Sequence, residues 1–251
     1  MCLETLRVRL VFDFDLMQSS EVVLGECVVA TRIRALIFDF DGTIVDTETP
    51  DYEAWRSIYL DHGCDLNLAE WVSRIGTVSG FDPFRQLQIE TGRSLDHKSI
   101  ETERRKRKLK MLDQQKLRPG VMEWLSGGRE IGLSCGIASS APRKWILPLL
   151  ERLEIAEIFE TVAPLDDVTN AKPDPAVFQL AASHLGIDPE QAVAIEDSHH
   201  GVQASVAAQM FTVAVPNYMT REHDFSSAHC VLDSLSDSTL HNIMEMRGAE
   251  G

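Results

Sequence analysis

The chain has 251 residues, which is enough for one large domain or for a core that carries a smaller inserted domain. Hydrophobic residues make up 44% and charged residues 25%, so the composition excludes global disorder, and the longest apolar runs are too short to cross a bilayer. Acidic residues outnumber basic ones by 39 to 24, and the formal charge of -15 would repel a nucleic-acid backbone. We therefore expect a globular protein that binds neither nucleic acid nor membrane.

Residues 1–31 are expected to be an N-terminal extension outside the folded core. Acidic residues interrupt this stretch, which argues against a secretory signal or a transit peptide. It contains Phe12-Asp13-Phe14-Asp15, an echo of Phe38-Asp39-Phe40-Asp41, but Leu16-Met17 follows where the later copy has Gly42-Thr43. The echo lacks the residues that would turn the chain around an anion, so we interpret it as having no catalytic role.

From residue 34 onward, short apolar runs alternate with amphipathic segments, as in βα units around a parallel sheet. Five runs are predicted as buried strands, at 35–38, 133–138, 159–163, 192–195 and 211–215. Two helical stripes lie between them: Trp145, Ile146, Leu149, Leu150 and Leu153, and then Val177, Phe178, Ala181, Ala182 and Leu185 before Gly186. The pattern predicts an α/β fold with a doubly wound, Rossmann-like parallel sheet.

The stretch 50–117 contains no convincing strand and is predicted to be an all-helical insertion, or cap. Tyr52, Trp55 and Tyr59 recur at helical spacing, and 98–115 resembles a long polar helix. The predicted boundaries are 32–48 and 118–240 for the core, 49–117 for the cap and 241–251 for a C-terminal tail. Insertions after a strand's carboxyl end lie over the ligand crevice of such sheets, so this one is placed to act as a lid.

Two acidic pairs follow predicted strands directly. Asp39 and Asp41 follow the first strand, and Glu196-Asp197 follows the fourth. Parallel strands would bring both pairs to one edge of the sheet, where crowded carboxylates require a shared proton or a hard cation with oxygen ligands. The sequence therefore predicts a Mg²⁺ site that accepts a phosphate.

Complementary groups follow two other strands. Ser139-Ser140 closes the second strand, and Lys172 follows the third in Lys-Pro-Asp-Pro. Hydroxyls and an ammonium group are the donors that a transferring phosphoryl group requires.

Taken in order, these residues resemble the haloacid dehalogenase superfamily. The resemblance covers 33–215 and consists of DxDGT at 39–43, Ser139, Lys172 in KPDP, and Glu196-Asp197-Ser198 with Gly201. It implies that Asp39 is the nucleophile and Asp41 the acid and base. It also implies that Ser139 and Lys172 bind phosphate, with Ser140 as an alternative to Ser139, and Thr43 in the turn is predicted to bind phosphate as well. The Mg²⁺ ligands it implies are Asp39, the Asp41 carbonyl, Glu196 and Asp197.

The resemblance implies hydrolysis of a small phosphomonoester, such as a sugar phosphate, and leaves two alternatives open. Dehalogenation is disfavoured because the family's dehalogenases lack the second acid of DxD. The helical cap is similar to that of the β-phosphoglucomutase branch, whose mutases use a His after the first motif and a cap Arg. Residues 47–52 offer no His and residues 76–81 no Arg, so phosphatase is preferred to mutase. A non-catalytic binder of a phosphorylated ligand is the other alternative.

Four other groups of residues could suggest a binding or metal site, and we interpret them as having no such role. The basic run 104–110 is expected to be a solvated cap face, and His199-His200 are expected to be loop residues without a metal role. Trp55 and Tyr59 are expected to pack within the cap, and Cys135 to be a buried thiol. Five scattered cysteines without CxxC spacing favour reduced thiols in a cytoplasm.

Overall fold

The computed structural model describes residues 32–73, 75 and 81–249. The echo at 12–15 and the cap loop at 76–80 therefore lie outside the described residues, and the interpretations placed on them stay predictions.

Among the described residues, six parallel strands form one sheet in the order β3-β2-β1-β4-β5-β6. The strands are β1 Ala35–Phe38, β2 Ser134–Ala138, β3 Thr161–Ala163, β4 Ala192–Glu196, β5 Phe211–Ala214 and β6 Cys230–Val231. The order runs outward in both directions from β1, so the predicted doubly wound sheet is confirmed. All five predicted strands are present. The sequence pattern missed β6, which has two residues and is too short to show a period.

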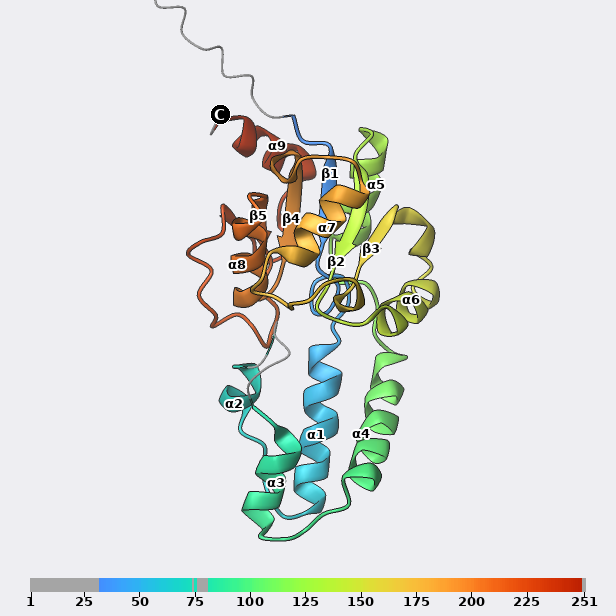
Figure 1. The fold of residues 1–251 in the computed structure, drawn as a ribbon, viewed down its shortest axis with the longest axis vertical. Coiled ribbons are helices and arrows are strands. Elements are labelled where there is room, and N and C mark those ends of the chain that lie inside the picture. Colours follow the sequence, from blue (N-terminus) through green and yellow to red (C-terminus); the bar gives the residue numbers. More distant parts are fainter. Residues whose placement is uncertain (1–31, 74, 76–80, 250–251) are drawn as a thin grey trace, which may run out of the picture.

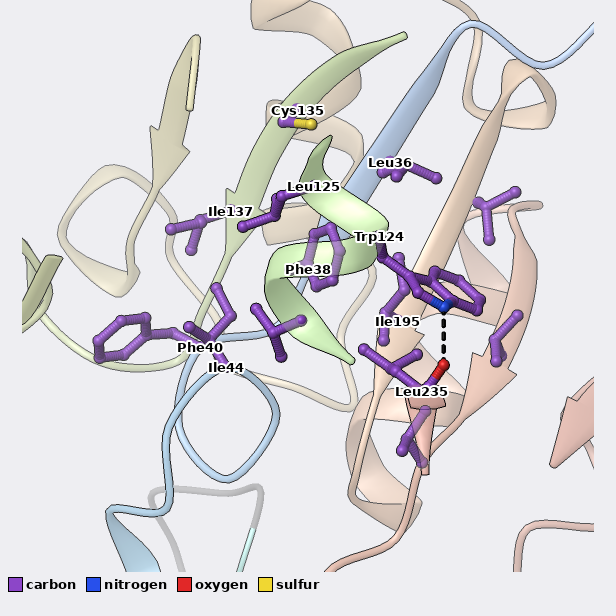
Figure 2. Close-up of a cluster of buried hydrophobic side chains, with 14 of the residues drawn as sticks. Leu36, Phe38, Phe40, Ile44, Trp124, Leu125, Cys135, Ile137, Ile195 and Leu235 are labelled. Atoms are coloured by element: carbon purple, nitrogen blue, oxygen red, sulfur yellow. Dashed lines mark hydrogen bonds between the residues drawn. The ribbon is translucent and has the colours of Figure 1, made fainter. Parts of the chain in front are cut away.

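One face of the sheet packs against α5 (Val121–Glu130), α6 (Arg143–Arg152) and α9 (Leu240–Ala249). Leu36 and Phe38 of β1 point to this side because strand side chains alternate between faces. Trp124 of α5 is buried here, and its indole N–H donates to the Leu235 carbonyl at 2.9 Å (Figure 2). The bond satisfies the only polar group that this large side chain brings into the core.

The opposite face packs against α7 (Ala176–His184) and α8 (His199–Ala207). Ala35, Ile37 and Ala194 point to this side, and most of their helical neighbours are also alanines. Small side chains on both surfaces let the helices lie close to the strands. The sheet is therefore covered on both faces, which leaves the strand ends as the place for a ligand.

The cap consists of α1 (Glu48–Asp61), α2 (Leu68–Val72), α3 (Pro83–Thr91) and α4 (His97–Leu112). Within the described part of 50–117 there is no strand, as expected. Figure 1 shows the cap beyond the carboxyl ends of the core strands, with α1 and α4 side by side. Trp55 and Tyr59 are buried in the cap's own hydrophobic cluster, which confirms their predicted packing role.

The basic run on α4 is not simply a solvated face. Arg105, Lys106 and Lys110 are exposed, as expected. Arg104 and Lys108, in contrast, both pair with Asp51 of α1, and the side chains of this trio are only 15 to 17% exposed. Because α4 buries few apolar side chains, these ion pairs provide much of its contact with α1.

Two further expectations differ from the structure. The predicted tail at 241–251 is helical as far as residue 249, because Leu240 and Ile243 of α9 are buried in the core. His199 and His200 are not loop residues but begin α8, whose N-cap Ser198 accepts a hydrogen bond from the Gly201 N–H. Among the described residues, no helix combines the length and the apolar character that a membrane span requires.

Gly120→Ala is expected to destabilise the protein far more than Gly63→Ala. Both glycines have positive φ, at 83° and 75°, which costs an alanine about 1–2 kcal/mol. A Cβ at position 120 would also lie 2.4 Å from the Leu235 backbone, whereas one at position 63 has no neighbour within 4 Å. Urea unfolding should show a loss of about 3 kcal/mol or more for Gly120→Ala. Equal losses in the two variants would contradict the packing described here.

Candidate active site

The site lies where β1 and β4 end side by side in the centre of the sheet. Ile37 of β1 is in register with Ala194 of β4, so the residues after the two strands leave the sheet at the same level. The backbone N–H of Asp39 donates to the Ile195 carbonyl at 2.9 Å, which continues the strand pairing into the site. The predicted convergence of Asp39 with Glu196-Asp197 is therefore present.

Lys172 is the centre of the electrostatic arrangement. Its Nζ donates to Asp39 Oδ1 at 2.5 Å, to Glu196 Oε1 at 2.6 Å and to the Ala138 carbonyl at 2.9 Å. These three contacts use all three N–H donors of the ammonium group. The side chain is only 2% exposed, so the loop after β3 carries a buried positive charge to the ends of β1, β2 and β4.

Three carboxyl groups cluster beside Lys172, and those of Asp39 and Glu196 contact its ammonium group. Asp39, Glu196 and Asp197 are buried and have oxygen atoms within 4.8 Å of one another. Burial raises the pKa of Asp39 to about 7, although Lys172 acts in the opposite direction. Burial and then the neighbouring Asp39 and Glu196 also raise the pKa of Asp197 well above its ordinary value. When all three groups are ionised, the cluster has more negative than positive charge, and a divalent cation with oxygen ligands would stabilise that ionised state.

Lys172 itself keeps its charge. Burial alone would lower the pKa of its ammonium group, but Asp39 and Glu196 together raise the pKa above its usual value. The site therefore has a permanent cation beside carboxyl groups whose protonation is variable.

Glycines make room for the two acids on β4. A Cβ at Gly201 would lie 1.9 Å from the Glu196 carboxylate, and one at Gly42 would lie 2.3 Å from Asp197 Oδ2. Gly42 also has a φ of 86°, which a side chain rarely adopts. The Glu196 carboxylate is held further by the N–H groups of Asp197 and Ser198. Both positions therefore require glycine because a carboxylate lies where a Cβ would be, and Gly42 also requires it because of its positive φ.

Thr43, predicted to bind phosphate, contacts one of the clustered carboxylates. Its hydroxyl donates to Asp197 Oδ1 at 3.1 Å, and Asn217 Nδ2 donates to the other oxygen, Oδ2, at 2.5 Å. Thr43 thus orients an acid in this structure, and its role toward phosphate stays a prediction.

Ser139 and Ser140 lie on the opposite side of Asp39, at the end of β2. Ser139 Oγ accepts the Ala141 N–H at 3.0 Å, which leaves its hydroxyl proton free to donate. Ser140 Oγ accepts the Lys172 N–H at 3.2 Å and so ties the lysine loop to β2. Ser140 thus contacts the backbone of Lys172 directly, and Ser139 lines the same cavity as the lysine.

A cavity of about 140 Å³ opens among these groups. Its lining residues are Asp39, Asp41, Glu48, Ile75, Ser139, Ser140, Ala141, Lys172, Asp197 and Ser198. Glu48 begins α1 and Ile75 follows α2, so the cap closes one side of the cavity and the core forms the other. The cavity therefore has a nucleophile candidate, hydroxyl donors and a cation around one small volume.

Asp41 is oriented separately from the three clustered acids. Its Oδ1 accepts two hydrogen bonds, from Thr47 Oγ1 at 2.6 Å and from Trp145 Nε1 at 2.8 Å. Its side chain does not belong to the cluster of three carboxylates, and the predicted metal contact of its carbonyl stays a prediction.

Three supporting residues could not be recognised from the sequence motifs. Arg118 donates to the Gly42 carbonyl at 2.5 Å and to the Val215 carbonyl at 3.1 Å, which fixes the turn after Asp41. Asn217 holds Asp197, as described above. Trp145 was predicted to lie on the apolar stripe of a helix. Its hydrogen bond to Asp41 depends on how α6 is positioned relative to β1, and the spacing of apolar residues gives no information on that.

His199 and His200 do not belong to the acidic cluster. Their Nδ1 atoms lie against backbone carbonyls, that of His199 2.6 Å from Asp224 O and that of His200 3.3 Å from Ile75 O. Both rings therefore contact the loops around the site rather than the carboxylates.

Comparison with known proteins finds relatives over the region that forms this site. Residues 36–215 match the family model described as haloacid dehalogenase-like hydrolase. YhcW of Bacillus subtilis (strain 168) is 39% identical over 213 residues, 85% of this chain and 97% of that protein. The fructose-1-phosphate phosphatase YqaB of Escherichia coli (strain K12) is 31% identical over 189 residues, 73% and 97% of the two chains.

A solved structure agrees with the fold. The crystal structure of CbbY from Rhodobacter sphaeroides in complex with phosphate superimposes with a TM-score of 0.66 at 26% identity. The match covers 83% of this chain and 98% of that chain.

Without a divalent cation, the protein is expected to lose stability relative to an Asp39→Asn variant as the pH rises from about 4 to about 7. Folded Asp39 keeps its proton up to a pKa of about 7, whereas an unfolded aspartate releases it near 3.8. The folded state therefore binds more protons in this window, and raising the pH favours unfolding by up to about 1.4 kcal/mol per pH unit. Urea unfolding in chelator at several pH values measures the difference. A difference that stays constant or grows in favour of the wild type would contradict the raised pKa.

Proposed function

The chain belongs to the haloacid dehalogenase-like hydrolase family, and from this membership we propose that it is a phosphatase that hydrolyses small phosphomonoesters through an aspartyl-phosphate on Asp39. One observation carries the proposal. The buried Asp39 carboxylate contacts the Lys172 ammonium and opens on a small cavity that Ser139 and Ser140 also line. This arrangement supports the proposal, because a carboxylate nucleophile works beside the donors that a phosphoryl group needs.

We propose Mg²⁺ as the cofactor. The fit rests on three buried, clustered carboxyl groups, two of which contact the one ammonium group; when all three are ionised they carry an excess of negative charge that a hard cation would neutralise. Asp39, Glu196 and Asp197 would hold the ion through side-chain oxygens and Asp41 through its carbonyl. The ion, when bound, supplies positive charge that offsets the repulsion between phosphate and Asp39.

In the first displacement, an Asp39 oxygen attacks phosphorus and the bond from phosphorus to the leaving oxygen breaks. Asp41 gives its proton to that oxygen, so the alcohol leaves neutral. In the second displacement, water attacks phosphorus and gives a proton to Asp41 while the bond from phosphorus to Asp39 breaks. Inorganic phosphate leaves, and both aspartates return to their starting state.

The phosphoryl oxygens are proposed to contact Ser139, Ser140 and Lys172. Ser139 keeps its hydroxyl proton for this contact, because its oxygen already accepts the Ala141 N–H. The three N–H donors of Lys172 are already held by Asp39, Glu196 and the Ala138 carbonyl, so a phosphoryl oxygen would replace one of these acceptors, while the positive charge is in place beforehand.

The proposed substrates are phosphate esters of small uncharged alcohols, with sugar phosphates as the leading class. Among the lining residues, Lys172 is the only cation, and it is matched by two carboxylates. Glu48 and Asp41 add further acids, which would repel a second anionic group on a substrate. The name of YqaB, a fructose-1-phosphate phosphatase, supports this class.

With Mg²⁺, the wild type is expected to release inorganic phosphate from at least one member of a panel of sugar and polyol phosphates. Asp39→Asn should lower this rate by roughly 10⁴-fold, because the amide cannot attack phosphorus. Asp113→Asn, the same change at an exposed position on the end of α4, should leave the rate unchanged. A phosphate-release assay with purified proteins measures all three.

Other outcomes identify the alternatives. Conversion of one sugar phosphate into another with little phosphate release indicates a mutase, and binding without any conversion indicates a non-catalytic protein. Full activity in Asp39→Asn would contradict the nucleophile assigned here.

Removal of divalent cations is expected to abolish phosphate release, and Mg²⁺ should restore it. Mg²⁺ at 100 times its Kd should also stabilise the fold by about 2.7 kcal/mol, roughly 5–10 °C in Tm for a protein of this size. Asp197→Asn should reduce this thermal shift, because it removes one buried ligand. Calorimetric melting with and without Mg²⁺ provides the measurement. Equal shifts in the wild type and Asp197→Asn would contradict the proposed ligand set.

A further inference from the structure

Asp41 is held by a tryptophan that comes from a different part of the core. Trp145 lies in the first turns of α6, 104 residues further along the chain, and its indole N–H donates to Asp41 Oδ1 at 2.8 Å. The second donor to the same oxygen, Thr47 Oγ1, comes from the segment just before α1. Asp41 is therefore hydrogen-bonded both to the core helix α6 and to the segment that leads into the cap.

Both hydrogen bonds are made to one oxygen. Oδ1 accepts from the indole and the hydroxyl, so Oδ2 is the oxygen available to carry a proton, and Asp41 lines the cavity. An indole N–H is a donor only and does not titrate near neutral pH, so it fixes the carboxyl group in the same way whether Asp41 is protonated or ionised. A hydroxyl alone can rotate to accept instead of donate, and so specifies the orientation less strictly.

The indole ring is in turn contacted by the cap. Lys108 Nζ of α4 lies 4.4 Å from the centre of the Trp145 ring, on its face, which is a favourable cation–π geometry. Lys108 is held there by Asp51 of α1, with Nζ 3.0 Å from Oδ2. A chain of contacts therefore runs from the cap helices through Lys108 and Trp145 to the carboxyl group of Asp41.

We propose that Trp145 is the positioning residue for the acid and base Asp41, and that Lys108 links this positioning to the placement of the cap. The inference rests on the proposed phosphatase function. When the cap sits on the core as in this structure, the Lys108 contact holds the indole and the indole orients the acid. Protonation of the leaving group is thereby coupled to the presence of the cap over the substrate.

If Trp145 positions Asp41, its loss should affect substrates according to their leaving group. An alkoxide leaving group needs the Asp41 proton, whereas p-nitrophenolate is a stable anion that leaves without one. Disturbing Asp41 should therefore slow cleavage of an alkyl phosphate much more than cleavage of p-nitrophenyl phosphate. A general loss of structure would slow both alike.

Trp145→Phe tests the indole N–H, because phenylalanine keeps an aromatic ring for Lys108 and removes the donor, at the cost of some ring volume that the Trp124→Phe control also loses. We expect kcat/KM for the sugar phosphate that the wild type hydrolyses fastest, with fructose 1-phosphate as first choice, to fall at least about 10-fold. For p-nitrophenyl phosphate the fall should be under about 3-fold. Trp124→Phe is the matched control: it removes an indole hydrogen bond to the Leu235 carbonyl in the core and should change both substrates by the same factor.

Lys108→Met tests the link to the cap, with Lys110→Met on the exposed side of the same helix as its control. Lys108→Met should shift the ratio of the two kcat/KM values in the same direction as Trp145→Phe, and Lys110→Met should not. If Trp145→Phe lowers both substrates equally, the positioning role is overturned. If only the Lys108 variant leaves the ratio unchanged, the link to the cap is overturned.

A spectroscopic measurement separates failure of this inference from failure of the proposed function. The indole ¹H–¹⁵N resonance of Trp145, assigned by its loss in Trp145→Phe, should move in Asp41→Asn because the acceptor changes from a carboxyl to an amide oxygen. This readout needs no turnover. A moved resonance in a protein that hydrolyses no phosphate ester would retain the contact and reject the phosphatase, whereas an unmoved resonance would reject the contact itself.

Discussion

The structure of the site depends on one buried ammonium group. Lys172 satisfies its three donors with Asp39, Glu196 and the Ala138 carbonyl, and thereby joins the ends of β1, β4 and β2. Without it, the buried Asp39 and Glu196 would lose the ammonium group that both contact, and the repulsion among the three clustered carboxylates would increase. One ammonium group cannot neutralise three ionised carboxylates, and this is the basis on which we propose a cation at the site.

The doubly wound sheet explains how a few residues from distant parts of the chain form one site. Strand order places β1 at the centre with β2 and β4 on either side, so the segments after these strands share one edge without any long connection. The cap is inserted after β1, the strand that carries Asp39 and Asp41. The cap is therefore joined to the segment that contains Asp41, and the contacts of Lys108 with Trp145 and of Trp145 with Asp41 are the basis of the proposed link between cap and acid.

Much of this could be predicted from the sequence, because the signals are local. The apolar runs identify five strands, and acids placed directly after strands in a parallel sheet must meet. The rest depends on three-dimensional placement. Asn217 and Arg118 reach the site from loops with no motif, and Trp145 has the same spacing as its buried neighbours Ile146 and Leu149. The pairing of Arg104 and Lys108 with Asp51 was missed for the same reason, since a basic run does not reveal which face meets α1.

The most direct test of the central claim is to identify the phosphorylated residue during turnover. The protein is mixed with substrate and Mg²⁺, quenched in acid within the first turnover, and digested for mass spectrometry. A phosphoryl group on the peptide that contains Asp39, absent in Asp39→Asn, is the predicted result. Steady release of phosphate with no phosphorylated peptide, or with the phosphoryl group on another residue, would contradict the account.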